Sequence, residues 1–155
     1  MIYGNSAPFF FVVSCLVYDV LIAGGTVHLY SDEIRKDVRL LEKYIEKNGI
    51  TMSHISPAAL RFFHNRSASL KTVVTIGEKL TGQCSRDGYR LFNLFGMTET
   101  VVLTSYEVPD VVLEEIPIGV PVRGSIEYAI LDENGQKLKD GITGELCMSR
   151  FLMRI

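Results

Sequence analysis

The sequence predicts an α/β protein in which helices cover a mainly parallel sheet, followed by a small antiparallel β-barrel-like subdomain. Up to about residue 108, short apolar strand-like runs alternate with helical patterns, an order typical of parallel sheets. After Pro109, strand-like runs are separated by turn residues and no helical pattern is evident. The 155 residues are 47% hydrophobic and 22% charged, which suits one globular core. We expect an α/β part over residues 1–108 and a β subdomain of the same core over residues 109–155, with the boundary near 107–115.

The most apolar stretch, Phe9–Ala23, is expected to form a buried strand and helix. A signal peptide is excluded because no Lys or Arg precedes Arg35. A membrane-spanning helix is excluded because the stretch is too short and contains Asp19. The sequence therefore predicts no membrane partner.

The next segments read as a strand and an amphipathic helix. Thr26–Tyr30 follows a glycine pair and is expected to be a short strand. Ser31 or Asp32 can cap the following helix, which should end at Asn48-Gly49. The apolar residues of that helix fall on one face: Ile34, Val38, Leu41 and Ile45.

The middle of the chain continues the alternation. Pro57 suits the first position of a helix that runs through Leu60 and Phe63. The segments expected to be strands are Ile50–Ile55, Thr72–Ile76 and Arg90–Leu94.

The last third reads as an antiparallel unit. Strands are expected at Ile116–Val120, Ile126–Leu131 and Gly144–Ser149. Asp132–Gly135 is a strong hairpin signal, and Lys139–Gly141 is a second turn.

Charge and cysteine content exclude several classes of function. The formal net charge is −2 with both signs interspersed, so no nucleic-acid partner is predicted. A sparse, odd number of cysteines argues against a disulfide framework and favours a reducing, cytoplasmic location. Cysteine and histidine show no zinc-ligand spacing: the residues are Cys15, Cys84, Cys147, His28, His54 and His64.

Asn93–Thr100 is the segment that carries most chemical information. It follows a strand, so it is expected at the carboxyl edge of the sheet, where open α/β sheets bind ligands. Gly96 permits a ligand to approach the backbone closely, and Thr98 offers a hydroxyl for hydrogen bonding. Glu99 offers an oxygen ligand for Mg²⁺, and Phe95 offers a stacking face.

The chain resembles the adenylation domains of nonribosomal peptide synthetases, in the superfamily of AMP-forming acyl-CoA synthetases and luciferases. The similar stretches, in the family's order, are Val73–Leu80 ("GGE-x-L"), Asn93–Thr100 ("N-x-Y-G-P-T-E-T"), Ile116–Pro121 ("I-P-I-G-x-P"), Tyr128–Gly135 ("Y-x-L-D-x-x-G") and Gly141–Cys147 ("G-x-x-G-E-L-C"). The resemblance spans residues 20–150 and implies a partial AMP-forming ligase fold.

The resemblance also implies roles for single residues. ATP is implied to contact Gly77, Glu78, Asn93, Phe95, Gly96 and Thr98. Asn93 would lie near the adenine amino group with Phe95 stacked on the ring. Thr98 and Glu99 would be catalytic, with Glu99 holding Mg²⁺. The implied reaction activates an amino or other carboxylic acid as acyl-AMP and transfers it to the phosphopantetheine thiol of a carrier protein.

A mainly apolar acid pocket is implied at matching positions: His54, Val74, Ile76, Leu94, Val102 and Leu103. Val102 and Leu103 can equally be core residues. Phe11 or Ser14 replaces the family's aspartate for the substrate amino group, and Ile76 replaces a glycine. Met97 replaces a proline. The apolar lining favours a hydrophobic or small acid, and these departures argue against an amino acid.

Three functional hypotheses remain open from the sequence. In the first, the chain is an internal fragment that is inactive alone, because the family's phosphate loop would precede residue 1 and its ribose-binding aspartate and lid lysine would follow residue 155. In the second, it is a stand-alone ligase. In the third, it is a non-catalytic nucleotide- or partner-binding module. Expected partners are carrier proteins or other synthetase domains, with self-association through Phe9–Val13.

Overall fold

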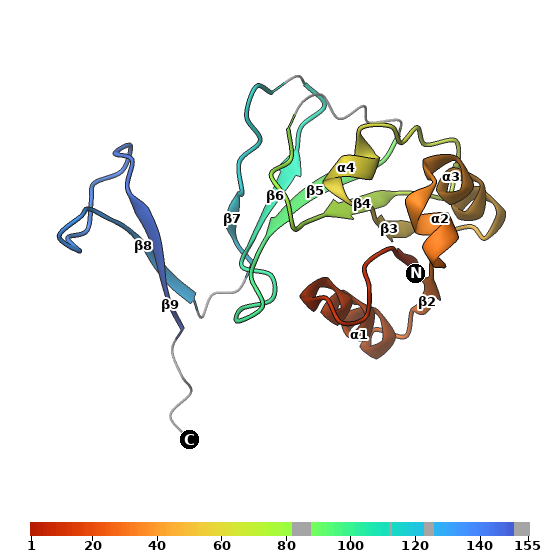
Figure 1. Cartoon of the computed structure of the whole chain (residues 1–155), viewed down its shortest axis with the longest axis horizontal. Coiled ribbons are helices and arrows are strands. Elements are labelled where there is room, and N and C mark those ends of the chain that lie inside the picture. The colour runs from red at the N-terminus through yellow and green to blue at the C-terminus, as the bar shows by residue number, and fades with distance from the viewer. Residues whose placement is uncertain (82–87, 112, 123–125, 151–155) are drawn as a thin grey trace. The chain divides into compact units, whose positions relative to one another are not determined.

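A computed structural model of the chain describes residues 1–81, 88–111, 113–122 and 126–150 (Figure 1). The chain forms two compact units, Met1–Val120 and Pro121–Ile155, which are described separately. The boundary expected near 107–115 lies inside the first unit, whose sheet continues beyond it.

The first unit contains a seven-stranded sheet in the order β2-β1-β3-β4-β5-β6-β7. The strands are β1 (Ile2–Asn5), β2 (Thr26–Leu29), β3 (Met52–His54), β4 (Thr72–Thr75), β5 (Arg90–Phe95), β6 (Thr104–Val108) and β7 (Val120–Pro121). Strands β1 to β5 pair in parallel, and β6 pairs antiparallel with β5. The prediction of a mainly parallel sheet is therefore confirmed.

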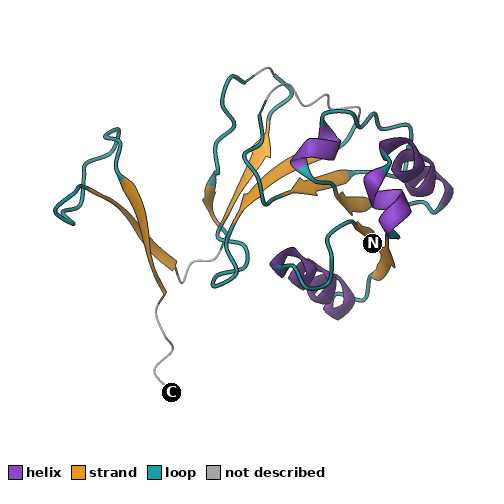
Figure 2. Ribbon diagram, in the orientation of Figure 1, coloured by secondary structure: helices purple, strands orange, loops and turns teal. Residues whose placement is uncertain are grey.

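Helices pack on both faces of this sheet (Figure 2). They are α1 (Cys15–Ile22), α2 (Asp32–Lys36), α3 (Val38–Lys47) and α4 (Pro57–Leu60), and a 3-10 turn covers Val12–Ser14. Val17 of α1 packs in a cluster with Val74, whereas Leu41 of α3 packs in a cluster with Val73. Because Val73 and Val74 are neighbours in β4, their side chains lie on opposite faces. The sheet is thus a central layer between α1 and the other helices.

The opening of the chain differs from the prediction for Phe9–Ala23. The helix is present as α1, but the strand lies earlier, at β1, and Phe10 is 90% exposed. Strand β1 is short, and its glycine and asparagine hid it from a pattern search. Gly4 is required there because the buried Tyr30 ring lies directly against it.

The helix expected from Ser31 to Asn48 is interrupted at Asp37. Asp37 has extended backbone angles, and its Oδ1 accepts hydrogen bonds from the amides of Arg39 (2.8 Å) and Leu40 (3.2 Å). Asp37 therefore caps a new helix, α3, although the apolar spacing runs through it. The predicted end is confirmed, because Gly49 has a φ of 62° after Asn48.

Two other boundaries were wrong and one strand was missed. The helix at Pro57 ends at Leu60, and Phe63 is buried beyond it. Strand β6 was not expected at all. The strand expected over Ile116–Val120 is reduced to the two residues of β7.

The second unit contains a two-stranded antiparallel sheet of β8 (Ile126–Leu131) and β9 (Glu145–Arg150). The turn at Asp132–Gly135 forms as predicted. Asp132 Oδ1 accepts hydrogen bonds from the amides of Asn134 (2.9 Å) and Gln136 (2.8 Å). A mainly parallel sheet with helices in one unit and a small antiparallel sheet in the other agree with the predicted fold class.

Candidate functional site

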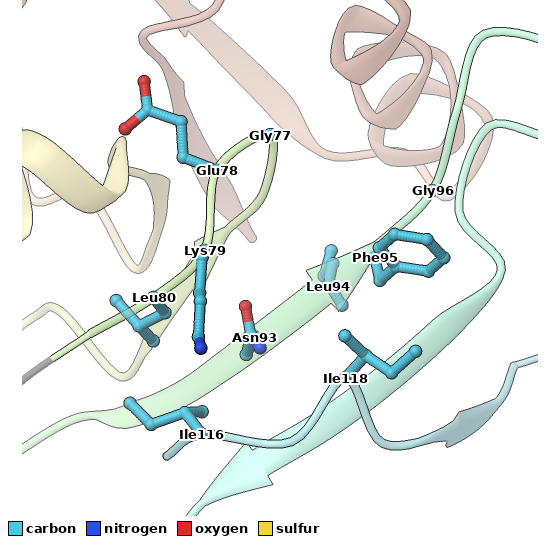
Figure 3. A pocket seen from close by; sticks show the side chains of 10 residues that line it. All are labelled: Gly77, Glu78, Lys79, Leu80, Asn93, Leu94, Phe95, Gly96, Ile116 and Ile118. Carbon is cyan, nitrogen blue, oxygen red and sulfur yellow. The ribbon is translucent and has the colours of Figure 1, made fainter. Parts of the chain in front are cut away.

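Two pockets of the first unit lie at the carboxyl ends of the parallel strands. The first pocket, about 330 Å³, is bounded by residues that follow β4 and residues at the end of β5 (Figure 3). The second pocket, about 420 Å³, is bounded by residues that follow β1, β2, β3 and β4. Gly77 and Glu78 line both pockets, so the two spaces adjoin at the turn after β4. This edge is where parallel α/β sheets bind ligands.

The first pocket brings together most residues predicted to contact the nucleotide. Its lining is Gly77, Glu78, Lys79, Leu80, Asn93, Leu94, Phe95, Gly96, Ile116 and Ile118. Asn93 is 5% exposed, and its Nδ2 donates a hydrogen bond to the Pro117 carbonyl oxygen at 2.9 Å. That bond fixes the plane of the amide group. Isoleucines on either side of Pro117 complete the apolar part of the wall (Figure 3).

Thr98 and Glu99 are not among the lining residues of either pocket. Both are exposed in the turn after β5, where the amides of Thr100 (3.0 Å) and Val101 (2.8 Å) donate to the Met97 carbonyl oxygen. Val101 has a φ of 64°, an unusual conformation for a β-branched residue. Gly96 makes this turn possible, because a Cβ there would lie 1.7 Å from the Val101 carbonyl oxygen.

The second pocket contains His54, which is 5% exposed. Its Nδ1 lies 2.8 Å from Ser6 Oγ, and its Nε2 is buried without a hydrogen-bond partner in the described structure. Arg35, Lys36 and Glu78 supply the charges of this pocket. Arg35 also pairs with Asp32 at 2.8 Å.

Most of the predicted acid-pocket residues are packed against helix α1 or its preceding turn. Ile76 and Val102 form a buried cluster with Val13, and Val74 packs near Val17. Leu103 is 1% exposed. Of the predicted set, His54 and Ile76 line the second pocket, and Leu94 lines the first.

The two positions offered for the missing aspartate behave differently. Phe11 is 51% exposed and lines the second pocket. Ser14 is buried, and its hydroxyl donates to the Phe9 carbonyl oxygen at 3.0 Å. Neither places a carboxylate in the pocket.

Several lining residues are not marked by the sequence. Ser6 lies in the loop after β1 and Arg35 lies in α2, so these two lining residues of the second pocket are distant in sequence and no local pattern marks them. Ile116 and Ile118 belong to the segment Ile116–Pro121, which the sequence marks only through its similarity to a family motif. The two isoleucines flank Pro117, but this local pattern does not by itself indicate a pocket wall.

The described residues contain no cluster of three or more His, Cys, Asp or Glu side chains able to hold a metal ion. Cys84 lies outside the described residues. Glu99 is a single exposed carboxylate, which fits an ion that takes its remaining ligands from phosphate oxygens and water. In the part of the chain that the structure describes, no helix is long and apolar enough to cross a membrane.

A third depression is strongly basic and is a competing site for an anion. It is lined by Lys36, Asp37, Val38, Arg39, Glu42, Arg61, Phe62, His64 and Arg66. Its arginines are exposed, and Arg61 donates to Thr81 Oγ1 at 2.6 Å. It lacks a buried polar group comparable to Asn93 or His54.

The burial of His54 predicts a pH-dependent stability. Burial lowers the pKa of His54 to about 4, whereas an unfolded histidine titrates near about 6.5. Between these values the unfolded chain binds more protons, so the free energy of unfolding falls as the pH falls. The expected loss between pH 7 and pH 5 is about 2 kcal/mol, measured by urea unfolding. His54→Leu should remove this slope; an unchanged slope would contradict the assignment.

Comparison with known proteins gives a consistent set of relatives. A family model described as AMP-binding enzyme matches residues 2–153. Bacitracin synthase 1 of Bacillus licheniformis is 35% identical over 135 residues, which are 86% of this chain and 2% of that protein. Zwittermicin A synthase ZmaJ of Bacillus cereus is 34% identical over 149 residues, with coverage of 83% and 28%. The chain thus spans a small part of these relatives.

Solved structures share the fold. CmiS6 has a TM-score of 0.81 at 22% identity, over 96% of this chain and 40% of that chain. The N-terminal subdomain of NpsA from Klebsiella oxytoca, in complex with 3-hydroxybenzoyl-AMSN, has a TM-score of 0.77 at 22% identity, with coverage of 96% and 41%.

Proposed function

The chain belongs to the AMP-binding enzyme family, and we propose that it supplies the adenine-facing and acid-facing walls of an adenylation site. The resemblance inferred from Asn93–Thr100 and its neighbouring motifs is confirmed by this membership. The observation that carries the proposal is that two pockets adjoin at Gly77 and Glu78. Adenylation requires such a pair of spaces, because the acid must meet the α-phosphate of a bound nucleotide.

In the proposed reaction, a carboxylate oxygen of the acid bonds to the α-phosphorus of ATP. The bond from that phosphorus to the pyrophosphate oxygen breaks, and the products are acyl-AMP and pyrophosphate. Asn93 would orient the adenine through Oδ1, because its Nδ2 is held by Pro117. Gly77 leaves space beside the nucleotide, since nothing lies within 4 Å of the place where its Cβ would be.

Thr98 and Glu99 would take part once the turn at Met97–Val101 contacts the phosphate groups of bound ATP. Mg²⁺ would supply charge neutralisation to the phosphate groups. Glu99 is the residue that would hold it, and Thr98 would donate its hydroxyl to a phosphate oxygen. The acyl group would then pass to a carrier-protein phosphopantetheine thiol, and the setting would be the cytoplasm, in line with the free thiols of Cys15 and Cys147.

A non-catalytic nucleotide-binding module is the second candidate. The observation that favours it is the exposure of Thr98 and Glu99 outside both pockets. An ATP–pyrophosphate exchange assay separates the candidates. We expect no exchange by this chain alone. Most of the rate enhancement comes from groups that stabilise the charge of the transition state, and the residues of the two pockets supply few such groups. Exchange above background would establish catalysis by the isolated chain.

Binding of Mg²⁺-ATP should raise the melting temperature of the chain. A ligand at 100 times its Kd stabilises the folded state by about 2.7 kcal/mol. Asn93→Asp keeps the oxygen that accepts from adenine but loses the donor to Pro117, so the thermal shift should shrink. Glu99→Ala should reduce the extra shift that Mg²⁺ gives over ATP alone.

The matched control is Glu46→Ala, which removes another exposed carboxylate, on α3. It should leave the thermal shift unchanged. A wild-type chain whose melting temperature is unchanged by saturating Mg²⁺-ATP would contradict the proposed function.

Self-association is a further part of the proposal. Phe9, Phe10 and Phe11 are 55%, 90% and 51% exposed, and side chains so apolar are usually covered by a partner surface. We expect a concentration-dependent dimer in analytical ultracentrifugation, and Phe10→Ser should shift it towards monomer. A wild-type monomer at all concentrations would exclude this surface as a contact.

A further inference from the structure

The hydrogen-bond pattern at His54 fixes which ring nitrogen carries its hydrogen. Ser6 Oγ lies 2.9 Å from the His54 carbonyl oxygen and 2.8 Å from His54 Nδ1. A carbonyl oxygen only accepts, so the single hydroxyl hydrogen is donated to it. Ser6 Oγ must then accept from Nδ1–H. In the neutral ring, Nε2 is therefore an unprotonated acceptor.

That acceptor lacks a donor in the described structure. His54 is 5% exposed, and Nε2 has no hydrogen-bond partner. Burial lowers the pKa of His54 to about 4, so the ring is neutral at pH 7. A buried acceptor of this kind in a pocket wall is suited to a ligand that brings a donor.

The charges of the second pocket restrict what that donor can be. Arg35 and Lys36 are two cations in its lining, together with the carboxylate of Glu78, and both cations also pair with Asp32, at 2.8 Å and 3.6 Å. Arg35 Nε is also buried without a hydrogen-bond partner in the described structure, although the guanidinium pairs with Asp32 through another nitrogen. A ligand ammonium would add a third cation near Arg35 and Lys36, whereas a hydroxyl would add no charge.

We propose that the acid taken by this site carries a hydroxyl group on its acyl portion, and that this hydroxyl donates to His54 Nε2. The inference rests on the proposed function, because it assigns the second pocket to the acid. The acyl portion must also be short, since Ile76 closes the space by packing with Val13 and Val102. His54 thereby selects among acids by hydrogen bonding, and Ile76 selects by size.

The test compares, on the full chain, three benzoates that differ only in their meta substituent: 3-hydroxybenzoate, benzoate and 3-(aminomethyl)benzoate. Their Kd values are measured by following the His54 ring signal in NMR titrations. We expect 3-hydroxybenzoate to bind at least about 10-fold more tightly than either other acid, because a site built to bond a hydroxyl rejects its absence strongly.

Two variants separate hydrogen bonding from packing. His54→Leu removes the acceptor. Ser6→Ala keeps the ring but no longer fixes which ring nitrogen carries the hydrogen. Both variants should bring the Kd ratio of benzoate to 3-hydroxybenzoate close to one, and the Kd values of the acids for these variants are measured from backbone amide signals of the second pocket. Equal Kd values in the wild-type chain, tightest binding of the ammonium acid, or no binding of any acid would each overturn the inference.

Mg²⁺-ATP binding distinguishes this failure from failure of the proposed function. Both variants should keep the wild-type thermal shift, because His54 and Ser6 lie outside the first pocket. A normal ATP shift with equal Kd values for the acids would refute only the hydroxyl assignment. A wild-type chain without an ATP shift would refute the proposed function itself.

Discussion

Replacing Gly96 by alanine should destabilise the first unit by about 3 kcal/mol and abolish the thermal shift given by Mg²⁺-ATP. The new Cβ would lie 1.7 Å from the Val101 carbonyl oxygen and 2.8 Å from its carbonyl carbon. Both atoms are backbone, so the contact cannot be relieved by a rotamer change. The turn must open, and the hydrogen bond from the Leu103 amide to the Phe95 carbonyl oxygen (2.8 Å) opens with it.

The matched control is Gly135→Ala in the second unit. Gly135 has a φ of 75°, but nothing lies within 4 Å of the place where its Cβ would be, so only backbone strain changes. Its cost should be about 1 kcal/mol, with nucleotide binding retained. Equal costs for the two variants in urea unfolding would show that the close contact at Gly96 does not exist in solution.

Gly4→Ala is also expected to be strongly destabilising, by about 3 kcal/mol. Its Cβ would lie 1.7 Å from the Tyr30 hydroxyl oxygen and 2.3 Å from Cζ of the same ring. Tyr30 is 7% exposed and packs in the large core cluster with Leu41 and Ile45. The ring must leave its place, because a buried aromatic side chain has few alternative rotamers.

Tyr30→Phe separates the contact from the hydrogen bond. The Tyr30 hydroxyl lies 3.0 Å from Ser53 Oγ, and loss of that bond should cost about 1 kcal/mol. In the double variant Gly4→Ala with Tyr30→Leu, the destabilisation should be less than the sum of the single effects. Additive values from chemical unfolding would argue that Gly4 and Tyr30 do not touch.

Periodic patterns predicted the fold class well, because buried strands and amphipathic helices dominate the first unit. Two kinds of local feature escaped them. Asp37 interrupts an apolar spacing that continues from α2 into α3, so helical periodicity could not show the break. Strand β6 begins directly after Leu103, and its five residues mix polar and apolar side chains without the continuous apolar run of a buried strand.

The candidate site was predictable in part. The clustering of Gly77, Asn93, Phe95 and Gly96 follows from their positions at the ends of neighbouring parallel strands. The tautomer of His54 was not predictable, because it depends on Ser6 from another loop. The exposure of Glu99 was not predictable either, because the turn conformation depends on Val101 and Gly96 together.

Amide chemical-shift mapping with Mg²⁺-ATP tests most directly where the nucleotide binds. We predict that the perturbed amides cluster at 77–80 and 93–96, around the first pocket. Perturbations confined to the basic depression at 36–39 and 61–66 would show binding by charge alone. That result, or an unchanged spectrum at saturating nucleotide, would contradict the assignment of the site.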